Sequence, residues 1–202
     1  MGVQEKIPTT HIGACIMPLF NVQKVPAAKF PHLTGIWDLV AYARVYWEAA
    51  QRLAESGTSS SLDAYPVAFL YRHALELAIK SILVENTPLH SHCEADILKR
   101  GHNLKDQIQD LQTVLTNRSA ELEGFKFSEL VAVVDDWDKY DPDSYAFRYS
   151  VKKDAVTPAS SAIAVEEEFR FDLLKFAETM DRTLDYLFSA KTEIDREIMS
   201  WA

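Results

Sequence analysis

Four polar residues, Arg72, His73, Glu76 and Lys80, stand in a segment that is otherwise almost entirely apolar, PVAFLYRHALELAIKSILVEN. On an α-helix with about 100° between successive residues, they fall in a single arc about 100° wide. An arginine can donate two parallel hydrogen bonds to a phosphate or carboxylate, and a histidine titrates near neutral pH. This polar stripe could therefore bind an anion or transfer a proton.

Internal pairing would explain the same residues without any ligand. Arg72 and Glu76 are four residues apart, so they could form an ion pair on one helix face. His73 could be a hydrogen-bonded core histidine. Networks of ion pairs that only stabilise a fold also contain unusual charged groups. From the residues alone, both interpretations stay open.

The segment GHNL, residues 101–104, could add a second histidine to the site. His102 stands where a helix is expected to begin, with Asn103 and Asp106 as a weak capping arrangement. Free backbone N–H groups at a helix start favour anions. A purely structural role at the start of the helix fits the segment equally well.

The segment DPDSYAFRYS, residues 141–150, places Arg148 among three aromatic residues, although loops are usually polar. Aromatic neighbours could hold the guanidinium flat or offer ring faces on which a base stacks. Alternatively, the segment is an aromatic plug that closes one end of a helical bundle, with Arg148 paired to Asp141 or Asp143.

Metal and cofactor motifs are weak or absent in the sequence. His90, His92 and Cys93 match no standard zinc spacing. The acidic stretch DDWDKYDPD lacks the glycine and the spaced glutamate of a calcium loop. Because negative charge is unfavourable near a helix C-terminus, basic partners are expected close to these acids. Standard nucleophile and phosphate-loop motifs do not occur, so we expect no metal and no cofactor.

Composition indicates a single domain that binds neither membranes nor nucleic acids broadly. The chain has 202 residues and 48% hydrophobic residues, enough for a core. A net charge of -9 argues against non-specific binding to acidic surfaces but allows a small basic pocket. Cys15 and Cys93 form no disulfide framework, and the longest early apolar run is too short to span a bilayer. We expect a cytoplasmic location.

The elements that would position these residues are mainly helices. Four prolines within residues 1–33 forbid a long helix and favour an extended N-terminal arm. Residues 34–202 are expected to form an all-α bundle of about five helices. These helices are expected at residues 34–56, 63–86, 103–115, 127–139 and 167–199. The segments YAFRYSV and SAIAV alternate like short strands, so a small β-hairpin could precede the last helix.

Buried faces follow from helical spacing in the first and last of these helices. In the first helix the apolar face comprises Ile36, Leu39, Val40, Ala43, Trp47, Ala50 and Ala54. In the last helix it comprises Phe169, Leu173, Phe176, Met180, Leu184, Leu187, Ile194 and Ile198. The second helix is apolar almost all round, which is typical of a central, buried helix.

Three segments, FLYRHALELAIKSIL, GHNLKD and DPDSYAFRYS, occur in the order found in an uncharacterised bacterial branch of the HEPN-like proteins. The resemblance covers roughly residues 34–190. It implies a helical bundle that often forms homodimers. Many HEPN proteins are metal-independent endoribonucleases of toxin–antitoxin, phage-defence or CRISPR systems. Their usual motif is an arginine and a histidine separated by about four to six residues, and no arginine of this chain has that spacing.

The resemblance does carry over one cluster as a binding site. Its residues are Arg72, His73, Glu76, His102, Ser144, Phe147, Arg148 and Tyr149. We expect the last loop to fold back over the second helix, so that Arg148 and its aromatic neighbours wall a pocket above the polar stripe. Our first hypothesis is a binding or interaction module of a bacterial defence or toxin–antitoxin system, with a nucleotide, RNA or a partner protein as ligand.

Two alternatives belong to other classes of function. A metal-independent endoribonuclease with a non-standard site would need an acid or base, such as His73 or His102, and a cation for the phosphate, such as Arg72 or Arg148. In the other alternative, the polar stripe is only an internal salt network in a helical scaffold protein.

Overall fold

The structure is a computed structural model that describes residues 39–56, 64–86, 101–116, 126–142, 144, 146–148 and 172–200. The expected N-terminal arm, residues 1–33, lies outside these ranges. Most of the expected β-hairpin and Tyr149 lie outside them as well.

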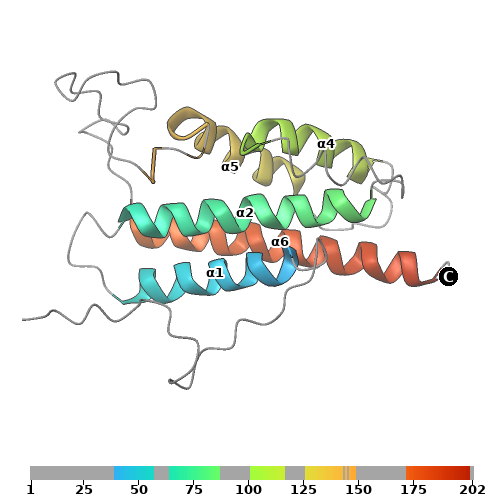
Figure 1. Ribbon diagram of the computed structural model, residues 1–202, viewed down its shortest axis with the longest axis horizontal. Coiled ribbons are helices and arrows are strands. Elements are labelled where there is room, and N and C mark those ends of the chain that lie inside the picture. The colour runs from blue at the N-terminus through green and yellow to red at the C-terminus, as the bar shows by residue number, and fades with distance from the viewer. Residues whose placement is uncertain are drawn as a thin grey trace, which may run out of the picture. The chain divides into compact units, whose positions relative to one another are not determined.

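Five helices and no strand make up the described part of the chain (Figure 1). They are α1 (Leu39–Glu55), α2 (Ala64–Asn86), α4 (Leu104–Thr116), α5 (Phe127–Tyr140) and α6 (Leu173–Ser200). For the described residues, the prediction of an all-α bundle of about five helices is confirmed. Their order and most of their ends agree with the expected ranges.

The start of α6 differs from the expected one. The sequence pattern placed it near residue 167, whereas the helix begins at Leu173. The Asp172 carboxylate accepts hydrogen bonds from the backbone N–H groups of Leu174 and Lys175, at 3.1 Å each. A side chain that satisfies the first free N–H groups of a helix marks its start. Asp172 is thus the capping signal that the apolar periodicity hid.

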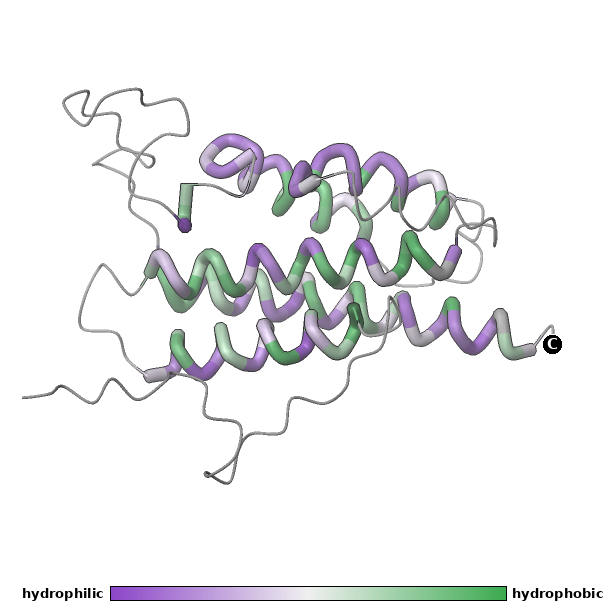
Figure 2. The backbone as a smooth tube through the Cα atoms, viewed as in Figure 1, coloured by the Kyte–Doolittle hydropathy of each residue, from purple (hydrophilic) through white to green (hydrophobic). Residues whose placement is uncertain are grey.

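Helix α2 lies at the centre of the bundle and packs against α1, α4 and α6 (Figure 1). It runs antiparallel to α1, and α5 packs against α4 and α6. Apolar residues occur along most of α2 in Figure 2, as expected for a helix that is covered on several sides. The fully buried apolar residues of α2 include Val67, Tyr71, Leu75, Ile79 and Ile82.

The predicted faces of α1 and α6 supply the rest of the central core. In α1 the buried positions are Ala43, Ala50 and Ala54, small residues that let α2 approach closely. In α6 the buried positions include Met180, Leu184, Leu187 and Ile194. The described members of both predicted faces are buried or half-buried. No helix in the described ranges is long and apolar enough to cross a membrane.

A half-buried carboxylate joins three helices within this core. One oxygen of Asp181 in α6 accepts hydrogen bonds from the Trp47 indole at 2.6 Å, the Gln51 amide at 3.1 Å and the Tyr71 hydroxyl at 2.8 Å. Burial raises the pKa of Tyr71 far above its usual value, and the hydrogen bond to Asp181 adds to this effect. Tyr71 therefore remains a donor, and α1, α2 and α6 share one polar junction.

Candidate functional site

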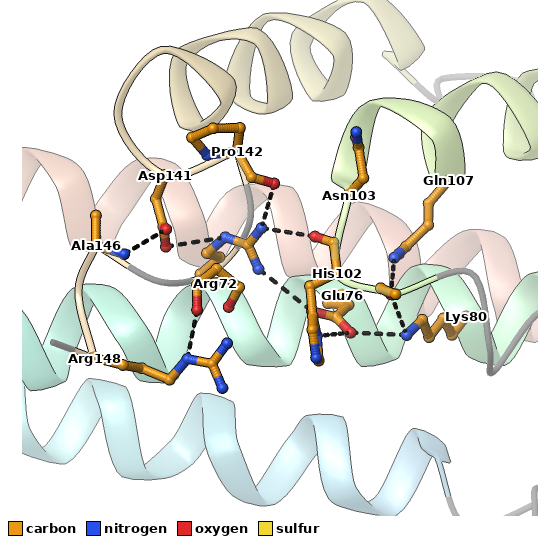
Figure 3. Close-up of polar contacts among 12 residues, drawn as sticks. Arg72, Glu76, Lys80, His102, Asn103, Gln107, Asp141, Pro142, Ala146 and Arg148 are labelled. Carbon is orange, nitrogen blue, oxygen red and sulfur yellow. Dashed lines mark hydrogen bonds and ion pairs between the residues drawn. The ribbon is translucent and has the colours of Figure 1, made fainter. Parts of the chain in front are cut away.

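The polar stripe of α2 faces two loops, one before α4 and one after α5 (Figure 3). Arg72 is 0% exposed and lies between them. Its Nη2 donates hydrogen bonds to the carbonyl oxygens of His102, at 2.8 Å, and of Pro142, at 3.4 Å. Arg72 therefore fastens both loops to the central helix.

Two carboxylates balance the buried guanidinium. Nη1 of Arg72 lies 3.3 Å from Oε2 of Glu76, and Nε lies 3.4 Å from Oδ2 of Asp141, an ion-pair contact rather than a hydrogen bond. Burial lowers the pKa of Arg72, while Asp141 and Glu76 act in the opposite direction. Asp141 also accepts a hydrogen bond from the backbone N–H of Ala146 at 2.8 Å. Asp141 thus links the loop after α5 both to its own backbone, at Ala146, and to Arg72 on α2.

Glu76 is the centre of the stripe and is 1% exposed. Its Oε1 accepts a hydrogen bond from Lys80 Nζ at 2.8 Å and lies 2.9 Å from Nδ1 of His102. Burial alone would raise the pKa of Glu76, but the bonds from Lys80 and His102 outweigh burial and hold the pKa below its usual value. The carboxylate is therefore ionised at neutral pH. The predicted ion pair between Arg72 and Glu76 is present, and Lys80 extends it.

The backbone of the loop before α4 contacts these charged side chains. Gly101 has a φ of 73°, in the left-handed region that favours glycine. Its carbonyl oxygen accepts a hydrogen bond from Lys80 Nζ at 2.9 Å. Asn103 then caps α4, because its side-chain oxygen accepts from the N–H groups of Lys105 at 2.9 Å and Asp106 at 3.3 Å. The predicted cap is present, so these two N–H groups at the start of α4 are satisfied by Asn103.

His102 combines a fixed ring with access to solvent. Its side chain is 47% exposed, while its carbonyl is held by Arg72 and its Nδ1 by Glu76. An ionised carboxylate can only accept a hydrogen bond, so Nδ1 carries the hydrogen. The neutral ring then has its lone pair on Nε2, which is the nitrogen that a ligand could reach.

His73 lies on the side of the polar stripe that faces α1, where it is half-buried between aromatic rings. Its ring meets the ring of Tyr46 edge to face, with 4.4 Å between centroids. It stacks on Phe69 at 5.8 Å with 9° between the ring planes. Burial lowers the pKa of His73; Glu76 acts against this effect, whereas the positive groups at His102 and Arg148 add to it. The ring is therefore largely neutral at pH 7.

The loop after α5 folds back against α2, as expected. Phe147 is buried and meets Trp137 edge to face at 5.3 Å, so it serves as the aromatic plug. Arg148 is exposed, its Nε donates to the Ser144 carbonyl oxygen, and its guanidinium carbon lies 5.7 Å from the centre of the Phe69 ring. Ser144 is itself buried, with a φ of 57°. The loop thus directs one aromatic residue inward and its arginine outward.

The acids of α5 have the basic partners that the sequence indicated. Lys105 Nζ lies 2.7 Å from an oxygen of Asp138 and 3.6 Å from one of Asp135. Lys139 pairs with Asp136 at 2.7 Å. Within the described ranges, no group of three or more His, Cys, Asp or Glu side chains is placed to hold a metal ion. His90, His92 and Cys93 lie outside those ranges.

The eight sequence candidates divide into an interior and a surface group, and Tyr149 lies outside the described residues. The interior group is Arg72, Glu76, Ser144 and Phe147. The others, His73, His102 and Arg148, together with the rings of Tyr46 and Phe69, form what we name the His-Arg surface. Sequence reasoning missed the two rings. The spacing of Phe69 four residues before His73 could have indicated one of them, but no local signal pointed to Tyr46.

Comparisons with known proteins leave the chain without an assigned family. No protein-family model, no curated protein and no solved structure matches it.

Proposed function

We propose that this chain is a HEPN-like helical binding module that holds a phosphate-bearing ligand, RNA or a nucleotide, at the His-Arg surface. The observation that carries the proposal is the gathering of three groups able to bear positive charge, His73, His102 and Arg148, around the exposed edge of the α2 stripe. Each comes from a different segment of the chain. The ligand would thus be recognised jointly by α2 and both loops.

The balance of charge supports an anionic ligand. Inside the protein, the cations Arg72 and Lys80 are matched by two carboxylates, Glu76 and Asp141, so the buried network is close to neutral. Arg148 and any protonated histidine add positive charge at the surface. Because the whole chain carries -9, this positive spot would favour one bound anion rather than broad attachment to nucleic acid.

The rings beside the charges support a ligand with a planar part. Tyr46 and Phe69 are half-buried and flank His73, and Arg148 lies over Phe69. Stacking of a base on an aromatic side chain contributes about 1–3 kcal/mol. A nucleotide unit offers both a phosphate for the cations and a base for a ring.

Binding of a labelled oligouridylate tests the proposal. We expect the double variant His102→Gln/Arg148→Gln to lose at least about tenfold in affinity, since it removes two groups that hold the phosphate. Fluorescence anisotropy at low salt gives the dissociation constants. Arg196→Gln is the matched control, because Arg196 is an exposed arginine of α6 paired with Glu193 and far along the chain from the site. Equal affinities in the wild type and the double variant would contradict the proposal.

One observation favours a second candidate, metal-independent cleavage of RNA. The buried Glu76 carboxylate orients the exposed His102 imidazole, and this is the arrangement by which a carboxylate assists a histidine that transfers protons. His102 would take the proton from a 2′-hydroxyl, whose oxygen attacks the adjacent phosphorus. The bond from phosphorus to the 5′-oxygen then breaks, and that oxygen takes a proton from water while Arg148 neutralises the phosphate. Incubation of the same oligonucleotide with EDTA separates the two candidates. Cleavage that disappears in a folded His102→Ala variant would establish the enzyme.

The HEPN-like resemblance adds a biological setting to the proposal. It implies a homodimer that works in a bacterial defence or toxin–antitoxin system, where a partner protein could be a further ligand. The all-α bundle of five helices supports this setting at the level of fold class. The interior salt network is compatible with it, because Arg72 and Glu76 would then act as the scaffold that holds His102 and the loop of Arg148 in place.

A further inference from the structure

We propose that the His-Arg surface takes up a proton when it binds its phosphate ligand, and that His73 accepts this proton. The inference rests on the proposed function, since it concerns the same surface and the same ligand. It adds a form of regulation, because affinity for the ligand would then rise as the pH falls.

The surroundings of His73 favour its neutral form in the free protein. Its ring lies between Tyr46 of α1 and Phe69 of α2, which limit its contact with water. Burial disfavours the charged form of a histidine. Three groups that can be positive act on the ring from different segments: Lys80 on α2, His102 before α4 and Arg148 after α5.

The carboxylate of Glu76, which acts on His73, is already engaged. Glu76 attracts a proton on His73, but it also pairs with Arg72, Lys80 and His102. Its charge is thus shared among several donors. In keeping with this geometry, the pKa of His73 is held below its usual value, first by burial.

A bound phosphate would reverse this balance. Held beside Arg148, it would offset the positive charge of that guanidinium and place a negative charge near the His73 ring. A nearby opposite charge stabilises the protonated form of a histidine. Because the coupling between two bound species is reciprocal, the phosphate that raises the pKa of His73 is itself bound more tightly once His73 is protonated.

The probe for the test is a single-stranded oligouridylate with a 5′-hydroxyl end. A terminal phosphate monoester has a second pKa near 6 and would titrate in the same range. The phosphodiesters of the oligouridylate keep one negative charge each across that range, so any proton taken up belongs to the protein. The protein is the full chain.

Two measurements give the proton count. Dissociation constants are measured between pH 5.5 and pH 8.5. As the pH increases from the pKa of His73 in the free protein to its pKa in the complex, the dissociation constant should rise by up to about tenfold per pH unit. Calorimetry in two buffers with different ionisation enthalpies should show uptake of up to about one proton. His73→Gln, which keeps a polar side chain without a charge, should abolish the uptake. His102→Gln should bind more weakly and keep it.

The outcomes are distinct. Uptake that is lost in His73→Gln and kept in His102→Gln supports the inference. Binding of the wild type without uptake overturns it, and so does uptake that follows His102 instead. Absence of binding at every pH overturns the proposed function and this inference with it.

A second measurement follows the titration in the wild type and needs the variants only to assign a signal. Proton NMR of the wild type should show one imidazole C2–H signal, among those of the six histidines, whose titration moves to higher pH when oligouridylate is added. Spectra of His73→Gln and His102→Gln under native conditions assign that signal. A titration that stays unchanged for His73 in the presence of the ligand would overturn the inference.

Discussion

Arg72 has a structural task that its position on α2 alone would not indicate. One guanidinium contacts two carboxylates and two backbone carbonyl oxygens, and all of these groups lie in the interior or at the base of the two loops. An exposed anion-binding arginine would keep part of its fork for a ligand. We therefore assign Arg72 to the support of the surface, whereas contact with the ligand belongs to Arg148 only within the proposed function.

Replacing Arg72 tests this assignment. Arg72→Met keeps the apolar stem but leaves Glu76 and Asp141 with less positive charge. Breaking one side of a buried ion pair typically lowers the free energy of unfolding by about 3–5 kcal/mol. Arg52→Met is the control, because Arg52 and Glu48 form an exposed pair, for which about 0–1 kcal/mol is expected. Urea denaturation measures both; similar values for the two variants would contradict the assignment.

At the scale of residues, the sequence predicted pairs but not their further partners. The spacing of four residues indicated the contact of Arg72 with Glu76, because neighbours on one helix face follow from helix geometry. The carbonyl oxygens of Gly101, His102 and Pro142 carry no signal of residue type. They depend on how loops distant in the sequence fold back on α2, which local patterns do not encode.

Among the elements, α2 determines where everything else lies. The apolar surface of α2 must be buried on several sides, and α1, α4 and α6 pack against it. Its polar stripe is then satisfied by the loops next to α4 and α5, as buried charge requires. The sequence indicated the central place of α2 because it is apolar all round. The late start of α6 was missed because apolar spacing continues before the Asp172 cap.

The junction at Asp181 should hold α1, α2 and α6 in register. Asp181→Ala would remove the acceptor of three hydrogen bonds and leave the hydroxyl of buried Tyr71 unpaired. Loss of a partner for a buried donor costs about 1–3 kcal/mol, so we expect a decrease of that size in the free energy of unfolding.

Asp181→Asn is the matched variant for this prediction. It keeps one acceptor oxygen at the same place and should retain much of the stability that the alanine variant loses. Thermal or urea unfolding of both variants provides the comparison. Equal losses in the two would show that the carboxylate charge, rather than the acceptor oxygen, stabilises the junction.

For the molecule as a whole, assembly is the property that follows least from the sequence. The all-α class and the order of the helices were predictable because hydrophobic periodicity is strong in long helices. A binding surface depends on which residues come together after folding, as half-buried Tyr46 and Phe69 do beside His73. The His-Arg surface could not be located before the helices were placed.

The proposed homodimer has a direct measurement. Light scattering coupled to gel filtration should give a mass near twice the 22.9 kDa of the chain over a range of concentrations. A mass that stays at that of one chain at every concentration would contradict the dimer. The proposed ligand would then have to bind to a single chain.

The shared fastening at Arg72 also has a consequence for motion. His102 and Pro142 belong to loops that are separated by two helices in the chain, yet both carbonyls accept from the same Nη2. If that guanidinium moves away, both loops lose an anchor together. Local opening of the two sides of the surface is therefore one cooperative event, and slow amide hydrogen exchange would be lost from both loops at a common rate.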